Sequence, residues 1–454
     1  MNRDRCRSRS VHGSSGLVVV VSLLLVAWAR PVYADDLLET YRLALQNDAR
    51  YRAAQAEARA SSTAIEQAHA GFRPTIKLEV DRMSTRQKII SSNNPVFATG
   101  STTFPTFSET LSLTQPIYRK DAIERLAQAK AVVRQSELTL LAAEQDLMMR
   151  TTAAYLSVLA ASDSLALAVA ERESVGKTLD LERERLRMGL GTVTTQYDAE
   201  ARFAITQARE IEAQHKLRDA RQAVREITNR PLGAFQTLRE AFTLAAPMPL
   251  DPERWVEQAL EQNLGLRARR EAVVVARQEV RRQESAHYPS VNLLLSHNRR
   301  DAGSTLFGGG SNVATTELML RLTVPIYEGG MTTATTREAA FRLEKAQEEL
   351  DLEQRAVERE ARAAFDGTIS GISLVRALQQ SVLSQQKALE GRQIGLRAGR
   401  FTLQAVLDAE RDLYLARRDH AQARYDYLLN QLKLRQAAGT LAESDLVNIH
   451  AALQ

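Results

Sequence analysis

The chain has 454 residues, a formal net charge of +5, and 25% charged but only 5% aromatic residues. Aromatic side chains contribute heavily to compact cores, so one globular core of this length would be expected to contain more of them. Most of the basic excess lies in residues 1–34, and removing their five Arg and one Asp lowers the net charge to about +1. The charge balance therefore does not point to a nucleic-acid-binding protein.

Residues 1–34 have the organisation of a secretory signal peptide. Four arginines between Arg3 and Arg9 precede the apolar run Leu17–Trp28, and Val32-Tyr33-Ala34 suits cleavage after Ala34. The only cysteine, Cys6, lies in this segment, so the mature chain is expected to lack a thiol for a disulfide or a lipid anchor. No later run reaches the ~18 unbroken apolar residues of a spanning helix, which leaves strands as the expected membrane-crossing elements.

Proline positions divide the rest of the chain into two helical tracts. No proline occurs between Pro116 and Pro231 or after Pro325, and because proline costs ~3 kcal/mol inside a helix, both tracts are free to be helical. A proline cluster between them predicts a linker over residues 230–251. Its members are Pro247, Pro249 and Pro252.

The first half, residues 35–229, predicts two shorter helices around a strand hairpin and one long helix. A helix over Leu37–Ala70 precedes a strand hairpin over 74–118 and a long helix over 119–188. Gly189 ends the long helix, and Thr192 suits the N-cap of a helix that returns over 192–229. The long helix carries a seven-residue repeat typical of laterally packed coiled coils, although a free-standing dimeric coiled coil is an alternative. Its members are Leu126, Val133, Leu140, Leu147 and Ala154, with Ala129, Ser136 and Ala143 three residues after the first three.

The second half, residues 252–439, repeats this plan at a constant offset of 210 residues. Arg187-Met188-Gly189 returns as Arg397-Ala398-Gly399, and Tyr197–Glu200 returns as Leu407–Glu410. In each half the two shorter helices together match the long helix, ~105 Å, so they are expected to stack end to end beside it. The elements expected here are a helix over 252–288, a strand hairpin over 289–327, a long helix over 328–398, a returning helix over 402–438 and a tail over 440–454.

The strand segments alternate apolar and polar residues, which is typical of a membrane barrel wall around water. Leu318, Leu320 and Leu322 alternate with polar or charged neighbours such as Arg321 and Thr323. Two amphipathic hairpins covering a soluble core are an alternative interpretation. The segments Ser91–Pro105 and Arg299–Thr315 are expected to be exposed hairpin loops, with Gly308-Gly309-Gly310 as a flexible tip. Tyr118 and Tyr327 are expected at equivalent strand ends, where an aromatic girdle would lie at the membrane interface.

Four strands cannot close into a barrel, and an open sheet edge is not tolerated in lipid. Several chains must therefore share one barrel. Because about eight strands fill their own interior with side chains, a water-filled pore needs more strands than that. Geometry alone permits three or four chains.

Five segments carry a resemblance to the TolC family of trimeric outer-membrane exit ducts, and it extends over nearly all of the mature chain. They are Val324–Met331, Ala398–Thr402, Val406–Ala409, Tyr425–Leu432 and Ala438–Leu441. The last two resemble the branch serving type I secretion and multidrug export more than the metal exporters. The resemblance implies an α+β membrane protein with an internal two-fold repeat. It also implies a trimeric twelve-stranded outer-membrane β-barrel, with four strands per chain, that continues into a long periplasmic α-helical coiled-coil barrel. Residues 230–258 and the tail after Gly439 would form part of a mixed equatorial domain.

The resemblance also implies partners and a location. The protein would form a homotrimer in the outer membrane of a Gram-negative cell, in contact with outer-membrane lipid, and extend into the periplasm. A periplasmic adaptor and an inner-membrane transporter of the ABC, RND or MFS type would recruit it for efflux of small molecules, type I protein secretion, or both. No cofactor is implied. The hairpin turns would contact the adaptor, through Gly189, Gly191, Thr192, Gly399, Arg400 and Thr402.

The same resemblance points to acids that ring the periplasmic entrance and to a latch that closes it. Asp408 aligns with one family acid, and its repeat counterpart Asp198 would supply a second ring. The alternative is that each is a solvated acid in the second turn of a helix, favoured by the helix dipole. This chain has Ala405 at another acid position, and Thr195 and Phe401 where family members often carry the closing partners. The residues near enough to act as a latch are Arg397, Arg400, Thr194 and Thr195.

No enzyme motif is evident. The histidines after residue 34 show no metal-ligand spacing, and no glycine-rich phosphate loop is present. The sequence therefore predicts a passive channel with no catalytic, cofactor-binding or metal site. A periplasmic coiled-coil adaptor or scaffold without a pore is the alternative, although adaptors have one hairpin flanked by compact β domains, and this chain has two hairpins alternating with two strand pairs.

Overall fold

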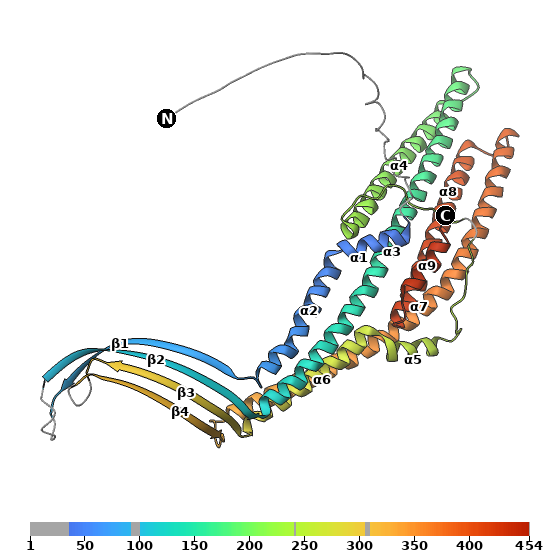
Figure 1. Ribbon diagram of the computed structural model, residues 1–454. Coiled ribbons are helices and arrows are strands. Elements are labelled where there is room, and N and C mark those ends of the chain that lie inside the picture. The colour runs from blue at the N-terminus through green and yellow to red at the C-terminus, as the bar shows by residue number, and fades with distance from the viewer. Residues whose placement is uncertain (1–35, 92–99, 240–241, 305–308, 454) are drawn as a thin grey trace, which may run out of the picture.

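The computed structural model describes residues 36–91, 100–239, 242–304 and 309–453. The expected signal peptide and Gly308 lie outside these ranges. A curved four-stranded sheet forms one end of an elongated molecule, and long helices run from the sheet to two hairpin turns at the other end (Figure 1). The linker and the C-terminal helix lie beside the middle of the helical part.

The helical stretch before the first strand is two helices, so the single helix expected over Leu37–Ala70 is wrong. α1 (Leu37–Asn47) and α2 (Ala49–Ala70) meet at Asp48, whose backbone is extended. The Asp48 carboxylate caps α2 by accepting from the Tyr51 N–H at 2.7 Å, and it accepts from both terminal nitrogens of Arg150 at 2.9 and 3.0 Å. Because aspartate is a strong N-cap, the buried ion pair can hold this break in place.

The same kind of break occurs in the second half. The helix expected over 252–288 consists of α5 (Pro252–Gln262), α6 (Leu264–Glu284) and a 3₁₀ turn at Ser285–His287. Asn263 separates α5 from α6, and its side-chain oxygen accepts from the Leu266 N–H at 3.0 Å. In both halves an Asx cap therefore bends the chain between a short helix, α1 or α5, and the longer helix that leads to the sheet.

Two long helices form the axis of the helical part. α3 (Lys120–Arg187) has α2 along its sheet-proximal part and α4 (Val193–Thr228) along its distal part. α7 (Met331–Arg397) has α6 and α8 (Leu403–Ala437) along it in the same way (Figure 1). Each half is thus one long helix beside shorter helices that follow one another along it.

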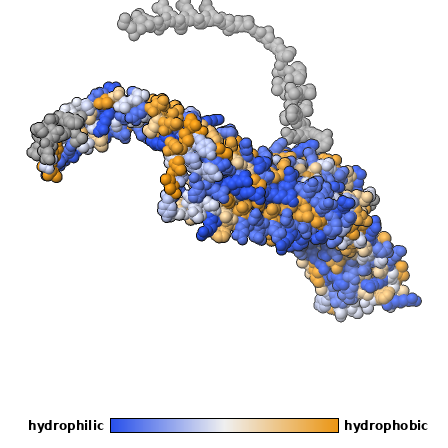
Figure 2. Space-filling model, turned by 90° about the horizontal axis from the view of Figure 1, so that it is seen from below, coloured by the Kyte–Doolittle hydropathy of each residue, from blue (hydrophilic) through white to orange (hydrophobic). Residues whose placement is uncertain are grey.

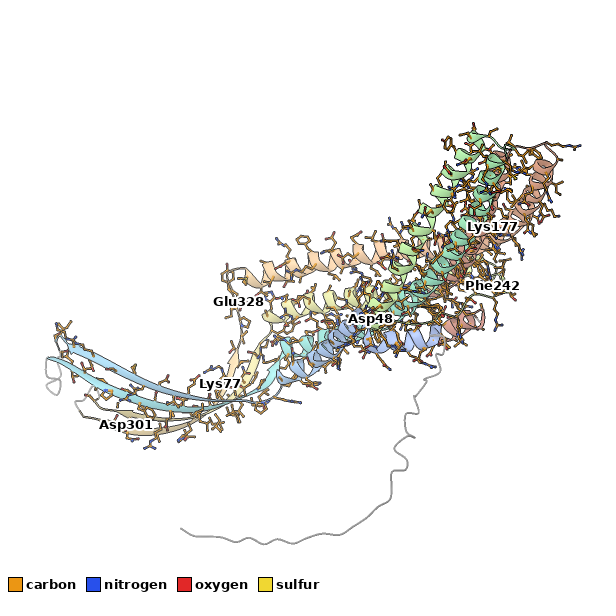
Figure 3. All side chains as sticks on the ribbon, turned by 90° about the horizontal axis from the view of Figure 1, so that it is seen from above. Asp48, Lys77, Lys177, Phe242, Asp301 and Glu328 are labelled. Carbon is orange, nitrogen blue, oxygen red and sulfur yellow. The ribbon has the colours of Figure 1, made fainter. Side chains whose placement is uncertain are left out.

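The sheet is antiparallel throughout, with the strand order β1-β2-β3-β4. Its strands are β1 (Thr75–Ile89), β2 (Gly100–Arg119), β3 (Ser290–Ala302) and β4 (Ser311–Thr323). The structure has shorter hairpin loops than the predicted ones, Ser91–Pro105 and Arg299–Thr315. β2 already begins at Gly100, β3 continues to Ala302 and β4 begins at Ser311. The residues that were predicted as loop but lie in strands include several threonines, which favour a pleated strand. Lys77 lies beside the helices and Asp301 near the far end of the sheet (Figure 3).

The strand register separates an apolar face from a polar face. Ile76, Leu113, Leu295 and Leu318 are successive partners across the four strands. The adjacent row, on the other face, contains Lys77, Ser112, Ser296 and Glu317. Apolar residues gather over the part of the sheet next to the helices (Figure 2), and Leu318, Leu320 and Leu322 are 63–71% exposed. An exposed apolar face of this kind requires lipid or another protein to cover it.

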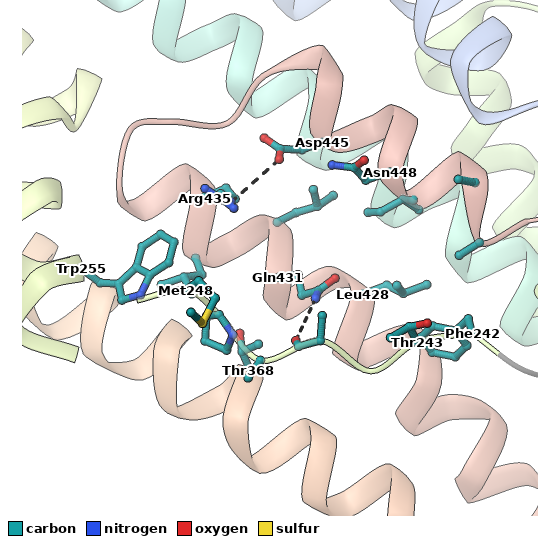
Figure 4. A pocket seen from close by; sticks show the side chains of 18 of the residues that line it. Phe242, Thr243, Met248, Trp255, Thr368, Leu428, Gln431, Arg435, Asp445 and Asn448 are labelled. Carbon is teal, nitrogen blue, oxygen red and sulfur yellow. Dashed lines mark hydrogen bonds and ion pairs between the residues drawn. The ribbon is translucent and has the colours of Figure 1, made fainter. Parts of the chain in front are cut away.

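A belt of loops and short helices surrounds the middle of the helices. The segment after α4 pairs with the C-terminus through Leu238 and Leu453, and α9 (Glu443–Ala451) lies beside α1 and α3. A pocket of 560 Å³ opens between residues 242–248, α5, α8 and α9 (Figure 4). In it Arg435 lies over the Trp255 ring and 3.9 Å from Asp445. These contacts hold α5 and the C-terminal helix against α8.

One described helix, α3, contains an 18-residue window apolar enough to cross a membrane by length and composition, with a mean hydropathy of 1.6. The helix itself is 68 residues long and packs against α2, α4, α6 and α8. Small apolar residues at coiled-coil positions raise mean hydropathy in the same way as a membrane span does. The window is therefore consistent with a helix that packs among other helices.

Candidate functional site: the tips of the helical hairpins

The two hairpin turns have the same backbone geometry. Gly189 and Gly399 adopt left-handed conformations, with φ of 73° and 70°. The Gly189 N–H donates to the Leu186 carbonyl at 3.0 Å, and the following N–H donates to the Arg185 carbonyl at 2.8 Å. Gly399 and Arg400 make the equivalent bonds at 3.0 and 2.8 Å. This pattern ends a helix with its last carbonyls satisfied, and glycine allows it without steric cost.

Threonine begins both returning helices. Thr192 and Thr402 each accept from the N–H three residues on, at 3.2 and 3.3 Å. Such capping stabilises a helix start by ~1 kcal/mol. Both tips are therefore rigid turns built from the same local chemistry, and they lie side by side at the end farthest from the sheet (Figure 1).

The tips differ in how the turn contacts its own long helix. In the second hairpin, Phe401 lies against Gly395, and a Cβ on Gly395 would be only 2.3 Å from Cδ2 of the ring. In the first hairpin the repeat counterparts are Gly191 and Arg185, and a Cβ on Gly191 would lie 3.3 Å from Cβ of Arg185. The large and small residues have exchanged places between the repeats.

The residues expected to act as a latch differ in their contacts. Thr195 is bonded to its own cap, since its hydroxyl donates to the Thr192 carbonyl at 2.8 Å. Thr194, Arg397 and Arg400 are exposed. In the part of the chain that the structure describes, the side chains of these last three have no hydrogen-bond or ion-pair partner. The side chains of Arg397 and Arg400 are thus free to meet a neighbouring molecule.

The two entrance acids also differ. Asp408 is half-buried, with its carboxylate 3.4 Å from the Arg411 guanidinium and 3.3 Å from the Gln404 amide on the same helix. Asp198 is exposed and has no ion pair among the described residues. Both lie just past the hairpin turns, and they stay candidates for a ring of charge.

A buried charge cluster near the tips was not expected from the sequence. The Glu171 carboxylate of α3 lies 3.3 Å from Arg202 and 3.1 Å from Arg209, both on α4. Glu410 of α8 packs beside it and is 5% exposed. A signal existed: extending the series Ala129, Ser136, Ala143 in steps of seven reaches Arg150 and then Glu171, so two charges occupy the coiled-coil seam.

The electrostatics of the cluster follow from burial. Burial raises the pKa of the Glu410 carboxyl, and the nearby Glu171 charge adds to this, while a hydrogen bond with Ser174 opposes it. Burial also lowers the pKa of Arg202, against the attraction of Glu171. The cluster joins the two hairpins, because Glu410 belongs to one and Glu171 to the other.

Apolar packing joins the hairpins closer to the tips. One cluster combines Val175 and Leu179 of α3, Ala199 of α4, and Leu403 and Leu407 of α8. Phe203 and Leu396 pack against it. The tip region of one chain is therefore held together by buried side chains from both hairpins, with Asp408 one residue from this cluster.

Comparisons with known proteins identify the family. The chain matches the model described as outer membrane efflux protein over residues 40–230 and 255–440. The chain belongs to this family. It is 31% identical over 442 residues to the outer membrane protein TolC of Vibrio cholerae, covering 96% of this chain and 98% of that protein. It is 28% identical to the proteases secretion protein PrtF of Dickeya chrysanthemi, covering 96% and 95%.

Solved structures of outer-membrane channels share the fold. The Campylobacter jejuni CmeC outer membrane channel aligns with a TM-score of 0.76 at 16% identity, covering 94% of this chain and 91% of that one. The Vibrio cholerae outer membrane protein VceC aligns with a TM-score of 0.73 at 18% identity, covering 89% and 96%. The resemblance to the TolC family and the α+β fold with four strands per chain are confirmed.

Membership in the outer membrane efflux protein family fixes the location and class of this protein. It is an exit channel of the outer membrane that extends into the periplasm, and its family consists of transport proteins rather than enzymes. Of the two expected girdle residues, Tyr118 lies in β2, while Tyr327 lies four residues beyond the end of β4 and is 84% exposed. The two tyrosines are therefore not at equivalent strand ends.

Proposed function

We propose that three copies of this chain form one exit channel, with twelve strands closed into a barrel in the outer membrane and the α3/α4 and α7/α8 hairpins forming a tunnel through the periplasm. The observation that carries this proposal is the sheet itself. Among the described strands β1 and β4 are unpaired edges, and next to the helices one face of the sheet carries exposed apolar residues from all four strands, such as Ile76, Leu111, Leu295 and Leu318. A sheet of this kind is stable in lipid only when closed.

The copy number follows from barrel size. Two copies would give a barrel of eight strands, and side chains would fill its interior. Three copies give twelve strands and leave room for water. Four copies are geometrically allowed, and similarity to TolC favours three. An adaptor or scaffold without a pore is disfavoured, because it would not need a lipid-facing sheet.

The hairpin tips would be the gated entrance and the adaptor contact. Exposed apolar and polar side chains gather there, including Leu190, Val193 and Tyr197. A periplasmic adaptor would dock on the turns at Gly189, Gly191, Thr192, Gly399, Arg400 and Thr402, and bring an inner-membrane transporter of the ABC, RND or MFS type. Similarity to the proteases secretion protein PrtF and to TolC supports both type I protein secretion and efflux as uses of the channel.

At the entrance, Asp408 and Asp198 would contribute acidic rings. Three like charges in a narrow low-dielectric mouth concentrate cations. Closure would rest on Phe401 and the apolar cluster of Leu403 and Leu407 more than on Arg397, Arg400, Thr194 or Thr195, because exposed ion pairs stabilise by only ~0–1 kcal/mol.

The mass of the detergent-solubilised protein tests the assembly. Native mass spectrometry after extraction from outer membranes should give three chains. A monomer that stays soluble after detergent removal would contradict the barrel and favour the scaffold.

A further inference from the structure

The two edge strands carry charges that find no partner within one copy. On the polar face of β1 these are Lys77, Glu79 and Asp81, and on that of β4 they are Glu317 and Arg321. Across the described part of the chain, none of the five has an ion-pair partner, although opposite charges on paired strands stabilise a sheet. Charges left open at both edges of a sheet suggest that the edges meet each other.

The geometry of a barrel restricts how β4 of one copy can meet β1 of the next. Four strands spaced ~4.8 Å apart span ~19 Å. A strand tilt of ~35–45° displaces each copy along its neighbour by ~13–19 Å, which is ~4–6 residues. The displacement must be even, because an odd shift would turn the apolar face of one strand into the pore. Shifts of four and six residues remain.

The direction of the shift is fixed by where the strands lie. In one copy the row that contains Glu317 ends at Lys77. Moving β4 toward the far end of β1 keeps all of Ser311–Thr323 beside Thr75–Ile89 for both shifts. Moving it the other way would place β4 beside the end of α2, which has no free strand hydrogen bonds.

Charge discriminates between the two shifts. A shift of four places Arg321 opposite Lys77 and Glu317 opposite Asp81, two pairs of like charge on the pore face. Like charges directly opposite destabilise a strand pair. A shift of six places Arg321 opposite Glu79 and Glu317 opposite Met83. On the lipid face a shift of four places Leu318 opposite Val80, whereas a shift of six places it opposite Arg82 and keeps Leu320 and Leu322 opposite apolar residues of β1. One apolar–charged pair on that face disfavours the shift of six less than two like-charge pairs disfavour the shift of four.

We propose that β4 of each copy pairs with β1 of the next copy in the six-residue register, with Arg321 beside Glu79 of the next copy. The inference rests on the proposed trimer and adds the register of its three junctions. Three Arg321–Glu79 pairs would then line the pore near its periplasmic side and specify which strands meet.

Disulfide trapping tests the register. The only native cysteine, Cys6, lies in the expected signal peptide, so introduced cysteines have no competitor. Val80→Cys with Leu320→Cys reports a shift of six, and Leu78→Cys with Leu320→Cys reports a shift of four. Directly opposed Cα atoms are ~4.5–5.5 Å apart, whereas diagonal ones exceed the ~7 Å limit for a disulfide. We expect at least tenfold more cross-linked trimer from the Val80 pair on non-reducing gels.

A charge exchange provides a second readout. Arg321→Glu should lower the fraction of detergent-stable trimer severalfold, and adding Glu79→Arg should restore it, whereas adding Asp81→Arg should not. If trimers form but cross-link through Leu78, or through neither pair, the six-residue register is wrong and the trimer stands. If the protein with native edges is monomeric in native mass spectra, the trimer itself is wrong.

Discussion

A Cβ atom on Gly395 would lie 2.3 Å from Cδ2 of Phe401, so the Phe401 ring rests directly on the backbone of α7. Phe401 is half-exposed, and its ring covers the turn that begins α8. This contact ties an aromatic side chain to the second hairpin at the place where the proposed entrance closes.

Gly395→Ala should displace the Phe401 ring and loosen the tip. Overpacking of this kind costs ~1–3 kcal/mol. Gly391→Ala is the matched control, because a Cβ there meets nothing within 4 Å, and Gly to Ala inside a helix stabilises by ~0.5–1 kcal/mol. Hydrogen exchange of residues 395–407 should rise in the first variant and stay equal or fall in the second.

Single-channel conductance of the same variants checks the role of Phe401 in closure. Gly395→Ala should raise it, and Gly391→Ala should not. Arg400→Ser should also have little effect, since Arg400 is exposed and unpaired among the described residues. A large conductance increase from Arg400→Ser with none from Gly395→Ala would make Arg400 the latch.

Asp408→Asn should weaken cation preference at the entrance. Three carboxylates near the mouth raise local cation concentration, and Asp198→Asn should have a smaller effect because Asp198 is exposed, whereas Asp408 is half-buried. Arg411→Gln should act in the opposite direction, since Arg411 lies 3.4 Å from Asp408 and offsets its charge. Reversal potential across a salt gradient measures all three. Unchanged selectivity in Asp408→Asn would make Asp408 an ordinary solvated helix acid.

Leu320→Arg should impair membrane assembly by placing a charge on the lipid face, at a cost of ~2–4 kcal/mol. Thr315→Arg is the control: it lies on the opposite, polar face of the same strand, two residues from Glu317. Folded trimer in outer-membrane extracts should fall for the first variant only. Equal defects would mean that the two faces of the sheet are assigned wrongly.

The charge cluster at Glu410 predicts a pH dependence with a definite sign. Because burial raises the pKa of Glu410 in the folded state, the protonated form favours folding. Its contribution is complete below the ordinary carboxyl pKa of 4.5 and is lost as pH rises through the higher folded value. After correction for intrinsic rates, residues 403–415 should exchange faster at pH 8 than at pH 5, and Glu410→Gln should abolish the difference. A wild type with equal rates would contradict this.

Much of the architecture could be predicted from the sequence, because duplication and proline placement leave strong signals. The repeat at an offset of 210 residues predicted the turns at Gly189 and Gly399. The alternation of apolar and polar residues predicted which strand residues share a face. The break at Asp48 was missed because a long-range partner, Arg150, helps to hold it, and heptad spacing does not show such partners. The Phe401–Gly395 contact depends on how a turn folds back, which is equally invisible in spacing.

The buried cluster shows a different limit. Glu171 was not predicted to be buried, although extending the seven-residue spacing from Ala143 reaches it. Its partners Arg202 and Arg209 come from a helix whose rotation about its axis the sequence does not fix. Contacts between copies are harder still to predict from the sequence, and the unpaired charges on the edge strands β1 and β4 are what indicates them.

Ion conduction across a planar lipid bilayer tests the central claim most directly. The purified outer-membrane protein should insert and give discrete current steps whose amplitude increases with salt concentration, with cations carrying more current than anions. Protein that inserts as a folded assembly yet passes no current at any salt concentration would contradict an exit channel.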